Sequence, residues 1–292
     1  MKCLLPALAV ASVVSLTAAA PAKADIFFQD TYISVRNLWQ DKQPGTVGNV
    51  NETAGNIQYV NAWTYGSNFV SLDIEDFSKK DGANQTGYAP HAKVTSDSME
   101  LYAVFATTFS GNAITGTKNF AFGPVKDVGF TLGYETDTQD DQFASYKRFV
   151  EFGPTFSIDV PKGFLNIGIY ATHEWNTNAY LANNSTNYNI APKVSVAWLF
   201  PISLGSVSAK FEGFVNVIGP KGRGGTGDSP HGTEILAHPK ILFDVGKMVG
   251  LKPGQFDAGI GYEYWYNKFG NQSKYLVSTQ QNAFFIEAGY HF

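Results

Sequence analysis

The chain ends in the nine residues FFIEAGYHF, 284–292, and this segment decides the fold class. Every second side chain is apolar or aromatic and therefore falls on one face of a β-strand: Phe284, Ile286, Ala288, Tyr290 and Phe292. A final strand of this form, ending on an aromatic residue, is the usual assembly signal of bacterial outer-membrane proteins. An ordinary edge strand of a soluble sheet is the alternative interpretation.

The same two-residue period recurs along the chain, for example in VSAKFE at 207–212 and in FDAGIGYEYWYN at 256–267. Such alternation is typical of strands with one polar and one apolar face. The predicted strands lie near 26–39, 56–64, 68–77, 98–109, 125–137, 147–159, 163–176, 188–200, 204–218, 233–247, 255–268 and 281–292. We therefore predict an all-β fold, a transmembrane antiparallel β-barrel of about 12 strands.

The connections between these segments favour a barrel over a soluble sandwich. Long connections rich in Gly, Asn, Ser and Asp alternate with short turns, as in outer-membrane barrels. The long ones are 37–55, 78–97, 219–232 and 270–280, and the short ones include 65–67, 161–163 and 201–204. The connection 110–122 is long where a short turn is expected, and the sequence leaves open whether it is a rim insertion or an extended strand end.

The N-terminal residues 1–24 predict a cleaved export signal, because Lys2 precedes an apolar stretch and Ala22-Lys23-Ala24 fits a small-residue cleavage site. The interruption at Pro6 disfavours a membrane-anchoring helix. Beyond Asp25 no apolar run is long enough for a transmembrane helix. We expect one domain, residues 25–292, located in the bacterial outer membrane.

Composition excludes several classes of function. Cys3 is the only cysteine and lies in the predicted signal, and the five histidines form no HExxH motif, so we expect no metal site and no cofactor. The net charge is −4 and no run of Lys or Arg occurs, so no nucleic-acid surface is expected. Aromatic residues make up 15% of the chain, and we expect Tyr262, Tyr264, Tyr266 and Tyr290 in the aromatic belts at the lipid interfaces.

Twelve strands enclose a narrow slot, since eight leave a filled interior and sixteen to eighteen a wide pore. Isolated charges in a dry interior cost several kcal/mol each, so the predicted lumen holds water, paired charges or both. The predicted inward-facing residues are Phe69, Asp73, Glu75, Glu100, Tyr102, Arg36, Glu135, Lys193, Lys210, Glu212, Phe214, His238, Lys240, Asp244, Glu263 and Trp265. All of these except Lys193 and Asp244 are candidates for binding solute. Bracing of the barrel is an equally open role for any single one of them.

Several motifs resemble the Tsx-like nucleoside-specific channel family. WTYGSNF at 63–69, followed by Asp73, is similar to the family motif W-x-Y-G-D-N-F, with Ser67 in place of the usual Asp. FGPVKDV, HPKILFDVGKMVG and GYEYWYNKFG resemble later family segments in order and spacing. The resemblance covers much of the chain and implies a monomeric twelve-stranded barrel whose narrow lumen passes nucleosides and related solutes.

The predicted function is therefore a narrow, substrate-specific channel in the outer membrane. A base can stack on lumen aromatics while the ribose hydroxyls meet Asp, Glu or Lys. Expected partners are the lipid bilayer and lipopolysaccharide, the assembly machinery through the strand ending at Phe292, and a nucleoside. A structural or adhesive barrel is the first alternative. A barrel hydrolase using His238 or His291 as general base is the second, but no catalytic residue is predicted, because His238 is expected to face the lumen, beyond the reach of lipid.

Overall fold

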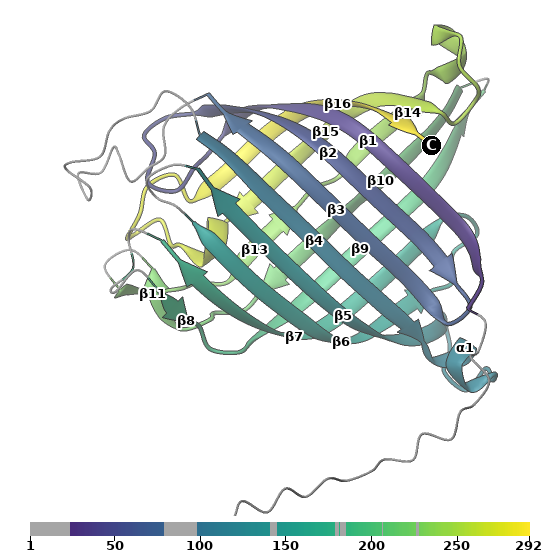
Figure 1. Ribbon diagram of the computed structural model, residues 1–292, viewed down its shortest axis with the longest axis horizontal. Coiled ribbons are helices and arrows are strands. Elements are labelled where there is room, and N and C mark those ends of the chain that lie inside the picture. The colour runs from purple at the N-terminus through teal and green to yellow at the C-terminus, as the bar shows by residue number, and fades with distance from the viewer. Residues whose placement is uncertain are drawn as a thin grey trace, which may run out of the picture.

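The computed structural model describes residues 24–78, 98–140, 145–178, 181, 185–205, 207–225 and 228–292. They form one antiparallel barrel of tilted strands (Figure 1). The predicted export signal lies outside the described residues except for Ala24, and so does nearly all of the predicted long connection 78–97.

Twelve spans make up the barrel wall, each antiparallel to its neighbours. They are β1 (Ile26–Asp41), β2 (Val50–Trp63), β3 (Gly66–Phe77), β4 (Ser98–Ser110), β5 (Val125–Gln139), β6 (Tyr146–Ile158), β7 (Phe164–Thr177), β9 (Ala191–Leu204), β10 (Val207–Ile218), β13 (Glu234–Ala237) with β14 (Lys240–Asp244), β15 (Phe256–Tyr266) and β16 (Gln280–His291). The first and last strands pair over eight residues, from Tyr32 opposite His291 to Trp39 opposite Phe284. This pairing closes the barrel and confirms the predicted fold class.

The span predicted as one strand over 233–247 is broken into β13 and β14 at His238 and Pro239. Both pieces lie between β10 and β15. Proline has no N–H to donate to a ladder, but its carbonyl still accepts from the Tyr262 N–H at 3.0 Å, and the His238 N–H donates to the Phe214 carbonyl at 2.9 Å. The interruption therefore leaves the wall closed.

Several predicted boundaries were wrong, because the strands are longer and the turns shorter than predicted. β1 reaches Asp41 and β2 begins at Val50, so the predicted connection 37–55 shrinks to 42–49. The predicted turn at 201–204 belongs to β9, and β10 begins at Val207. The predicted turn at 65–67 contracts to 64–65.

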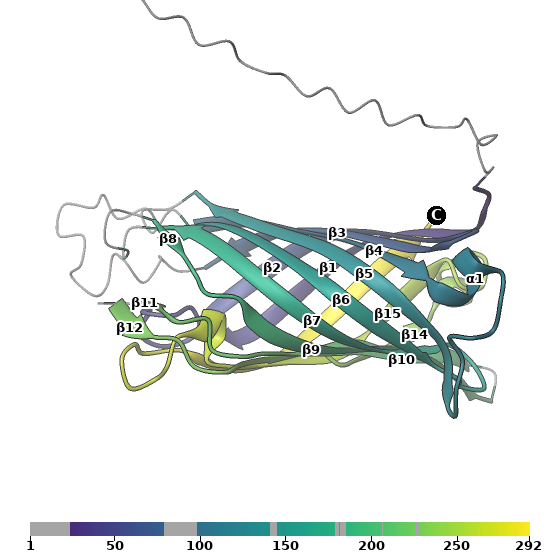
Figure 2. The same ribbon diagram turned by 90° about the horizontal axis from the view of Figure 1, so that it is seen from below.

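The connections are sorted between the two rims (Figures 1 and 2). One rim, which we call the loop rim, carries the short strands β8 (Thr186–Asn187), β11 (Arg223–Gly225) and β12 (Ser229–Pro230). The other, the turn rim, carries the C-terminus and the helix α1 (Gly111–Thr115).

The connection left open in the sequence, 110–122, is a rim insertion. β4 ends at Ser110, whose Oγ accepts a hydrogen bond from the Ala113 N–H at 3.0 Å and caps α1. A second turn-rim insertion holds the 3-10 helix η4 (Gly246–Val249). Among the described residues, no helix is both long and apolar enough to cross a membrane.

The barrel wall has an apolar outside and a polar inside. In β16 exposed and buried residues alternate strictly, so that Phe284 is 67% exposed while Phe285 is 1% exposed. The predicted belt residues Tyr262, Tyr264, Tyr266 and Tyr290 share the outward rows of β15 and β16. A closed antiparallel barrel with an apolar, aromatic-bordered outer surface is an outer-membrane protein.

Candidate functional site

Among the sixteen predicted inward-facing residues, His238 lies in the break between β13 and β14 and points inward to Glu263. The other fifteen lie on the inward rows of their strands, as strand parity, burial and lumen contacts indicate. One of them, Asp244, has a different role from the one predicted. Its carboxylate accepts hydrogen bonds from the N–H groups of Gly246 at 3.1 Å and Gly254 at 2.8 Å. Asp244 therefore fixes the turn-rim connection after β14 rather than contributing a charge to the lumen.

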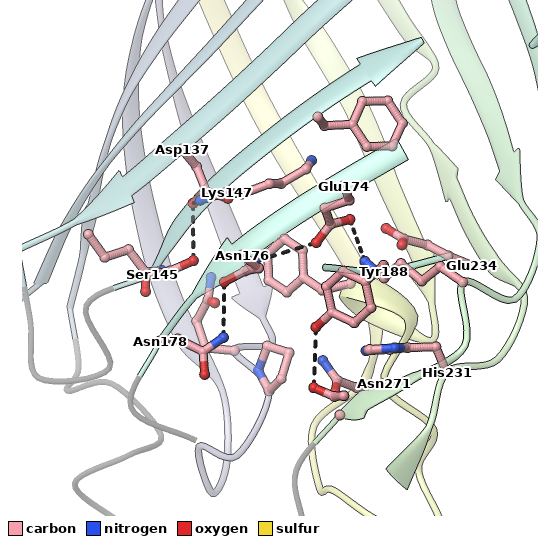
Figure 3. A pocket seen from close by; sticks show the side chains of 18 of the residues that line it. Asp137, Ser145, Lys147, Glu174, Asn176, Asn178, Tyr188, His231, Glu234 and Asn271 are labelled. Carbon is pink, nitrogen blue, oxygen red and sulfur yellow. Dashed lines mark hydrogen bonds and ion pairs between the residues drawn. The ribbon is translucent and has the colours of Figure 1, made fainter. Parts of the chain in front are cut away.

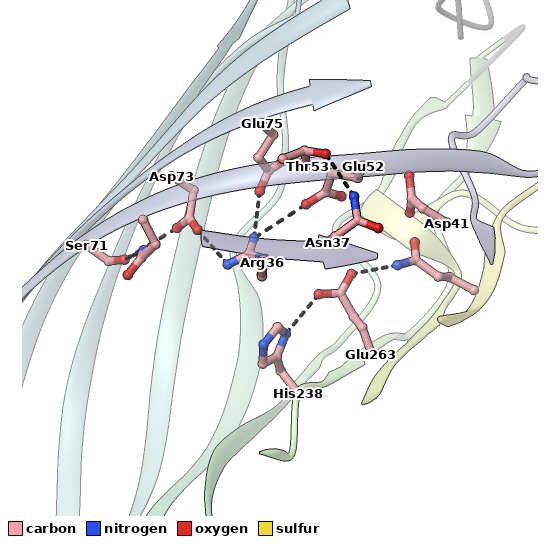
Figure 4. Close-up of polar contacts among 12 residues, drawn as sticks. Arg36, Asn37, Asp41, Glu52, Thr53, Ser71, Asp73, Glu75, His238 and Glu263 are labelled. Carbon is pink, nitrogen blue, oxygen red and sulfur yellow. Dashed lines mark hydrogen bonds and ion pairs between the residues drawn. The ribbon is translucent and has the colours of Figure 1, made fainter. Parts of the chain in front are cut away.

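Arg36 of β1 anchors the first charged group of the lumen (Figure 4). Its guanidinium lies 2.7 Å from Asp73 Oδ1, 3.1 Å from Glu75 Oε1 and 3.6 Å from Glu52 Oε1. The three carboxylates come from β2 and β3, so these contacts tie the first three strands together. One guanidinium is thus shared by three carboxyl groups, so this group holds more acids than bases.

A chain of polar contacts continues from β14 to β1. His238 Nδ1 lies 2.9 Å from Glu263 Oε2, and Gln281 donates to Glu263 Oε1 at 2.7 Å. The ammonium of Lys268, in the 3-10 helix η5 (Lys268–Gly270), donates to Gln281 at 2.9 Å and lies 3.2 Å from Asp41. Burial by itself lowers the pKa of Lys268, but the charges of Asp41 and Glu263 raise it by a larger amount. The net shift is upward, so the ammonium stays charged.

A lysine cluster joins β10, β14, β15 and β16. Lys240 Nζ lies 2.7 Å from Glu287 Oε1 and 3.3 Å from Glu212 Oε1. Lys210 Nζ lies 2.8 Å from Asp257 Oδ2. Each carboxylate of this cluster has a cation within direct contact, as a buried charge requires. These pairs brace the barrel across four strands.

A second braced group lies on β4, β5, β6 and β9. Lys193 Nζ lies 2.6 Å from Glu151 Oε2 and 3.3 Å from Glu135 Oε1. Glu135 also receives Lys147 Nζ at 3.0 Å and the hydroxyl of Tyr102 at 2.8 Å. The Lys147 ammonium lies 5.4 Å from the centre of the Tyr102 ring, within the range of a cation–π contact. The aromatic ring and the carboxylate thus hold the same cation.

A cavity of about 1080 Å³, including the solvent at its mouth, opens at the loop rim (Figure 3). We call it the loop-side pocket. On one wall Lys221 Nζ lies 2.5 Å from Glu174 Oε2 and 4.7 Å from the centre of the Tyr188 ring. The imidazole of His231 meets the Tyr188 ring edge-on at 4.8 Å. The wall therefore combines a salt bridge with two rings that pack edge-on.

Burial sets the ionisation of the two rings, which lie outside the strands. Burial, followed by the neighbouring Lys221 charge, lowers the pKa of His231 to about 3, so this imidazole is neutral at pH 7. Burial and then Glu174 raise the pKa of Tyr188 well above its ordinary value. Neither ring carries a charge near neutrality.

Three carboxylates of the loop-side pocket have hydrogen bonds but no cation. Glu100 accepts from Gln139 at 2.6 Å, Asp137 from Ser145 at 3.1 Å, and Glu234 from the Trp265 indole at 2.8 Å. Asp137 also accepts from the backbone N–H of Lys147 at 3.2 Å. Within the described part of the chain, none of the three has a side-chain nitrogen of Lys, Arg or His within 4.0 Å. This pocket therefore differs from the braced groups deeper in the lumen.

The structure does not bring the two predicted aromatic solute contacts together. Phe69 pairs with Val60 and Ala106 and lies near the turn at 64–65. Trp265 lies one residue from the loop-rim end of β15 and packs edge-on against Phe269 at 4.8 Å. Of the fourteen candidate solute residues, only Glu100 lines the loop-side pocket.

Sequence reasoning missed most of the pocket. Lys147 and Glu174 lie on inward rows of β6 and β7, and their alternation with outward neighbours was a usable signal. Tyr188, Lys221 and His231 come from connections at the loop rim, where no period applies. The described residues contain no group of three His, Cys, Asp or Glu side chains arranged to hold a metal ion.

No protein-family model and no curated protein matches this chain. Among solved structures it is similar to the translocator domain of the autotransporter NalP from Neisseria meningitidis, at 10% identity and a TM-score of 0.45, over 90% of this chain and 88% of that one. It is also similar to the NanC porin, at 12% identity and a TM-score of 0.43, over 88% of this chain and 98% of that one. These similarities assign no activity, and the fold rests on the closed strand pairing described above.

Proposed function

We propose that this barrel is a narrow, substrate-specific channel for nucleosides or related small solutes, and that the loop-side pocket receives the solute. The observation that carries the proposal is the composition of the pocket wall. Rings from Tyr188 and Phe149 stand beside carboxylates, amides and the Lys221 ammonium. Stacking of a base on an aromatic ring contributes about 1–3 kcal/mol at nucleic-acid-binding sites, and the polar groups suit ribose hydroxyls.

The similarity of 63–69 to the Tsx-like motif adds support from a different part of the chain. That motif lies at the turn rim, where the Trp63 ring contacts Tyr65 and Phe109 edge-on. Its place favours a role in the framework of the barrel rather than direct contact with solute.

Planar-bilayer recording of the refolded protein tests the proposal. Nucleosides are expected to block the ion current, and Tyr188→Ala is expected to weaken the block without lowering the open conductance. Tyr59→Ala is the matched control, because Tyr59 lies on an outward row and donates to Gln29 near the turn rim. Equal block constants in the wild type and Tyr188→Ala would remove the pocket from the solute path.

The packing of the lumen favours one other function, a structural or adhesive barrel. Leu38, Leu242 and Phe285 point inward and are at most 1% exposed, so apolar side chains fill part of the interior. A barrel plugged in this way would bind partners through its loops and conduct no ions. Absence of single-channel current from correctly inserted protein would favour this function. We propose no catalytic role, since the candidate base His238 lies between the rings of Phe214 and Phe285.

A further inference from the structure

The loop-side pocket has more hydrogen-bond acceptors than its own donors satisfy. Glu100, Asp137 and Glu234 lie on three different strands, β4, β5 and β13, and each is at most 8% exposed. Glu100 is opposite Gln139 in the β4–β5 ladder and Asp137 is opposite Tyr102, so the two carboxylates are diagonal neighbours. Two carboxylates this close repel each other, and the repulsion is relieved when one takes up a proton or when a cation lies between them.

The lysines of the pocket do not supply that cation. Lys221 is engaged by Glu174 at 2.5 Å. Lys147 is engaged by Glu135 at 3.0 Å, deeper in the lumen. Moving the Lys221 ammonium to Glu100 or Asp137 would leave the buried Glu174 without its cation, which is costly. Moving the Lys147 ammonium would break its ion pair with Glu135, which would then keep Lys193 at 3.3 Å.

Two further acceptors in the pocket wall have no partner among the described residues. The side chain of Gln139 uses its amide N–H on Glu100 and leaves its buried Oε1 without a hydrogen bond. His231 is 6% exposed, and its buried Nδ1 has no partner. Because the imidazole is neutral, this nitrogen accepts a hydrogen bond in the tautomer that carries its proton on Nε2. Buried polar atoms of this kind are normally satisfied, so unsatisfied ones point to an absent partner.

Part of the wall is apolar or aromatic. Phe77, Phe149 and Phe269 line it together with Leu276 and Ile218. Such a wall suits a carbon body, and aromatic faces also attract cations. A small metal ion fits poorly, since carboxylates from separate strands form no group of three ligands among the described residues.

We propose that the loop-side pocket binds an organic cation, a solute with an ammonium or guanidinium group on an apolar or aromatic body. The charged head lies at Glu100 and Asp137, where its N–H groups reach the free acceptors of Gln139 and the neighbouring wall. The body packs on the phenylalanine rings. The inference concerns the same pocket as the proposed channel but not conduction, so it holds for a channel and for a closed barrel alike.

Calorimetric titration of the refolded full chain in detergent tests this inference. The three probes, benzylammonium, benzyl alcohol and benzoate, are similar in shape and differ in charge. Benzylammonium is expected to bind at least about tenfold more tightly than benzyl alcohol, since a hydrogen bond to a charged group is worth about 1.5–3 kcal/mol. Benzoate is expected not to bind, because its charge repels the pocket carboxylates. Equal binding of the ammonium and the alcohol, or no binding of either, would overturn the inference.

Pocket variants test whether binding depends on the carboxylates, and gel mobility tests whether each variant still folds. Glu100→Gln combined with Asp137→Asn is expected to weaken benzylammonium binding about tenfold or more, with heat-modifiable gel mobility showing that the barrel is intact. If the double variant fails to insert, His231→Phe provides the second arm, since it removes one free acceptor and no charge. Asp159→Asn is the control, an exposed carboxylate at the turn rim, and its affinity is expected to stay unchanged. Unchanged affinity in both pocket variants would contradict the inference.

The outcomes are distinguishable from those of the channel experiment. Benzylammonium binding without any nucleoside block would overturn the nucleoside proposal and leave the cation site standing. Nucleoside block without a preference for benzylammonium over benzyl alcohol would overturn the cation site and leave the nucleoside proposal standing.

Discussion

The lysine cluster and the loop-side pocket both bury carboxylates inside the barrel, but they balance the charge differently. In the lysine cluster, Glu287 and Asp257 each have an ammonium at 2.7–2.8 Å. In the pocket, Glu100 and Asp137 have only uncharged hydrogen-bond donors. The difference separates carboxylates that join strands through ion pairs from carboxylates that have no cation among the described residues.

The largest effect is expected from breaking the lysine cluster. Lys240→Met leaves Glu287 and Glu212 without their shared cation and is expected to destabilise the barrel by about 3–5 kcal/mol, the usual cost of stranding a buried charge. Urea unfolding in lipid vesicles measures this loss. The double variant Lys240→Met, Glu287→Gln is expected to recover part of it, because one stranded charge is then gone. A loss below about 1 kcal/mol in the single variant would show that the cluster is not structural.

Charge on the outside of the wall sharpens the contrast between the two faces. Ile260 is 61% exposed on an outward row of β15, so Ile260→Lys is expected to cost about 2–4 kcal/mol near the bilayer midplane. Asn166→Lys, on the inward row of β7, is expected to cost less than about 1 kcal/mol. Equal losses in vesicle unfolding would mean that the strand register is wrong.

Gly261 also lies on the inward row of β15, but it is unsuitable as the inward control for the Ile260 variant. A Cβ at this glycine would lie 2.0 Å from Cζ of Phe285. The inward row of β15 is therefore closed at this point by an aromatic ring, and any side chain would force the ring to move.

A pH titration isolates the pocket from the rest of the lumen. The unfolded chain binds a proton at His231 near pH 6.5, whereas the buried imidazole stays neutral until about pH 3. Its contribution to stability is therefore complete above pH 6.5 and is lost as the pH falls, by about 1 kcal/mol between pH 7.5 and pH 5.5. His231→Gln is expected to unfold with a correspondingly smaller pH dependence. Parallel stability curves for the two proteins would show that the imidazole titrates normally.

The smallest change in stability is expected in the pocket itself. Glu100→Gln breaks no ion pair among the described residues, so the expected loss is less than about 1 kcal/mol. In a conducting channel the same variant is expected to lower the preference for K⁺ over Cl⁻, because it removes a lumen charge. Reversal potentials in a salt gradient measure that preference. A loss as large as that of Lys240→Met would erase the distinction between the two regions.

The sequence predicted the wall of the barrel well, since one rule governs every strand. Phe285 and Glu287 alternate with Phe284 and Ile286 because successive side chains in a strand point to opposite faces. The rule fails where backbone hydrogen bonding is locally changed. At Pro239 the missing N–H splits a span that the sequence predicts as one strand, and the alternation of polar and apolar residues does not mark that break.

The sequence by itself therefore determined the two faces of the wall and the residue types of the lumen, because a period of two needs only local geometry. It did not determine which inward residues meet. Lys268 reaches Asp41 across 227 positions and Lys221 reaches Glu174 across 47, whereas Phe69 and Trp265, both inward, lie toward opposite rims. Strand register, tilt and the closure of β1 on β16 set these neighbours, and each depends on the whole barrel. Only the tertiary structure decided which carboxylates receive a lysine and which have only uncharged hydrogen-bond donors.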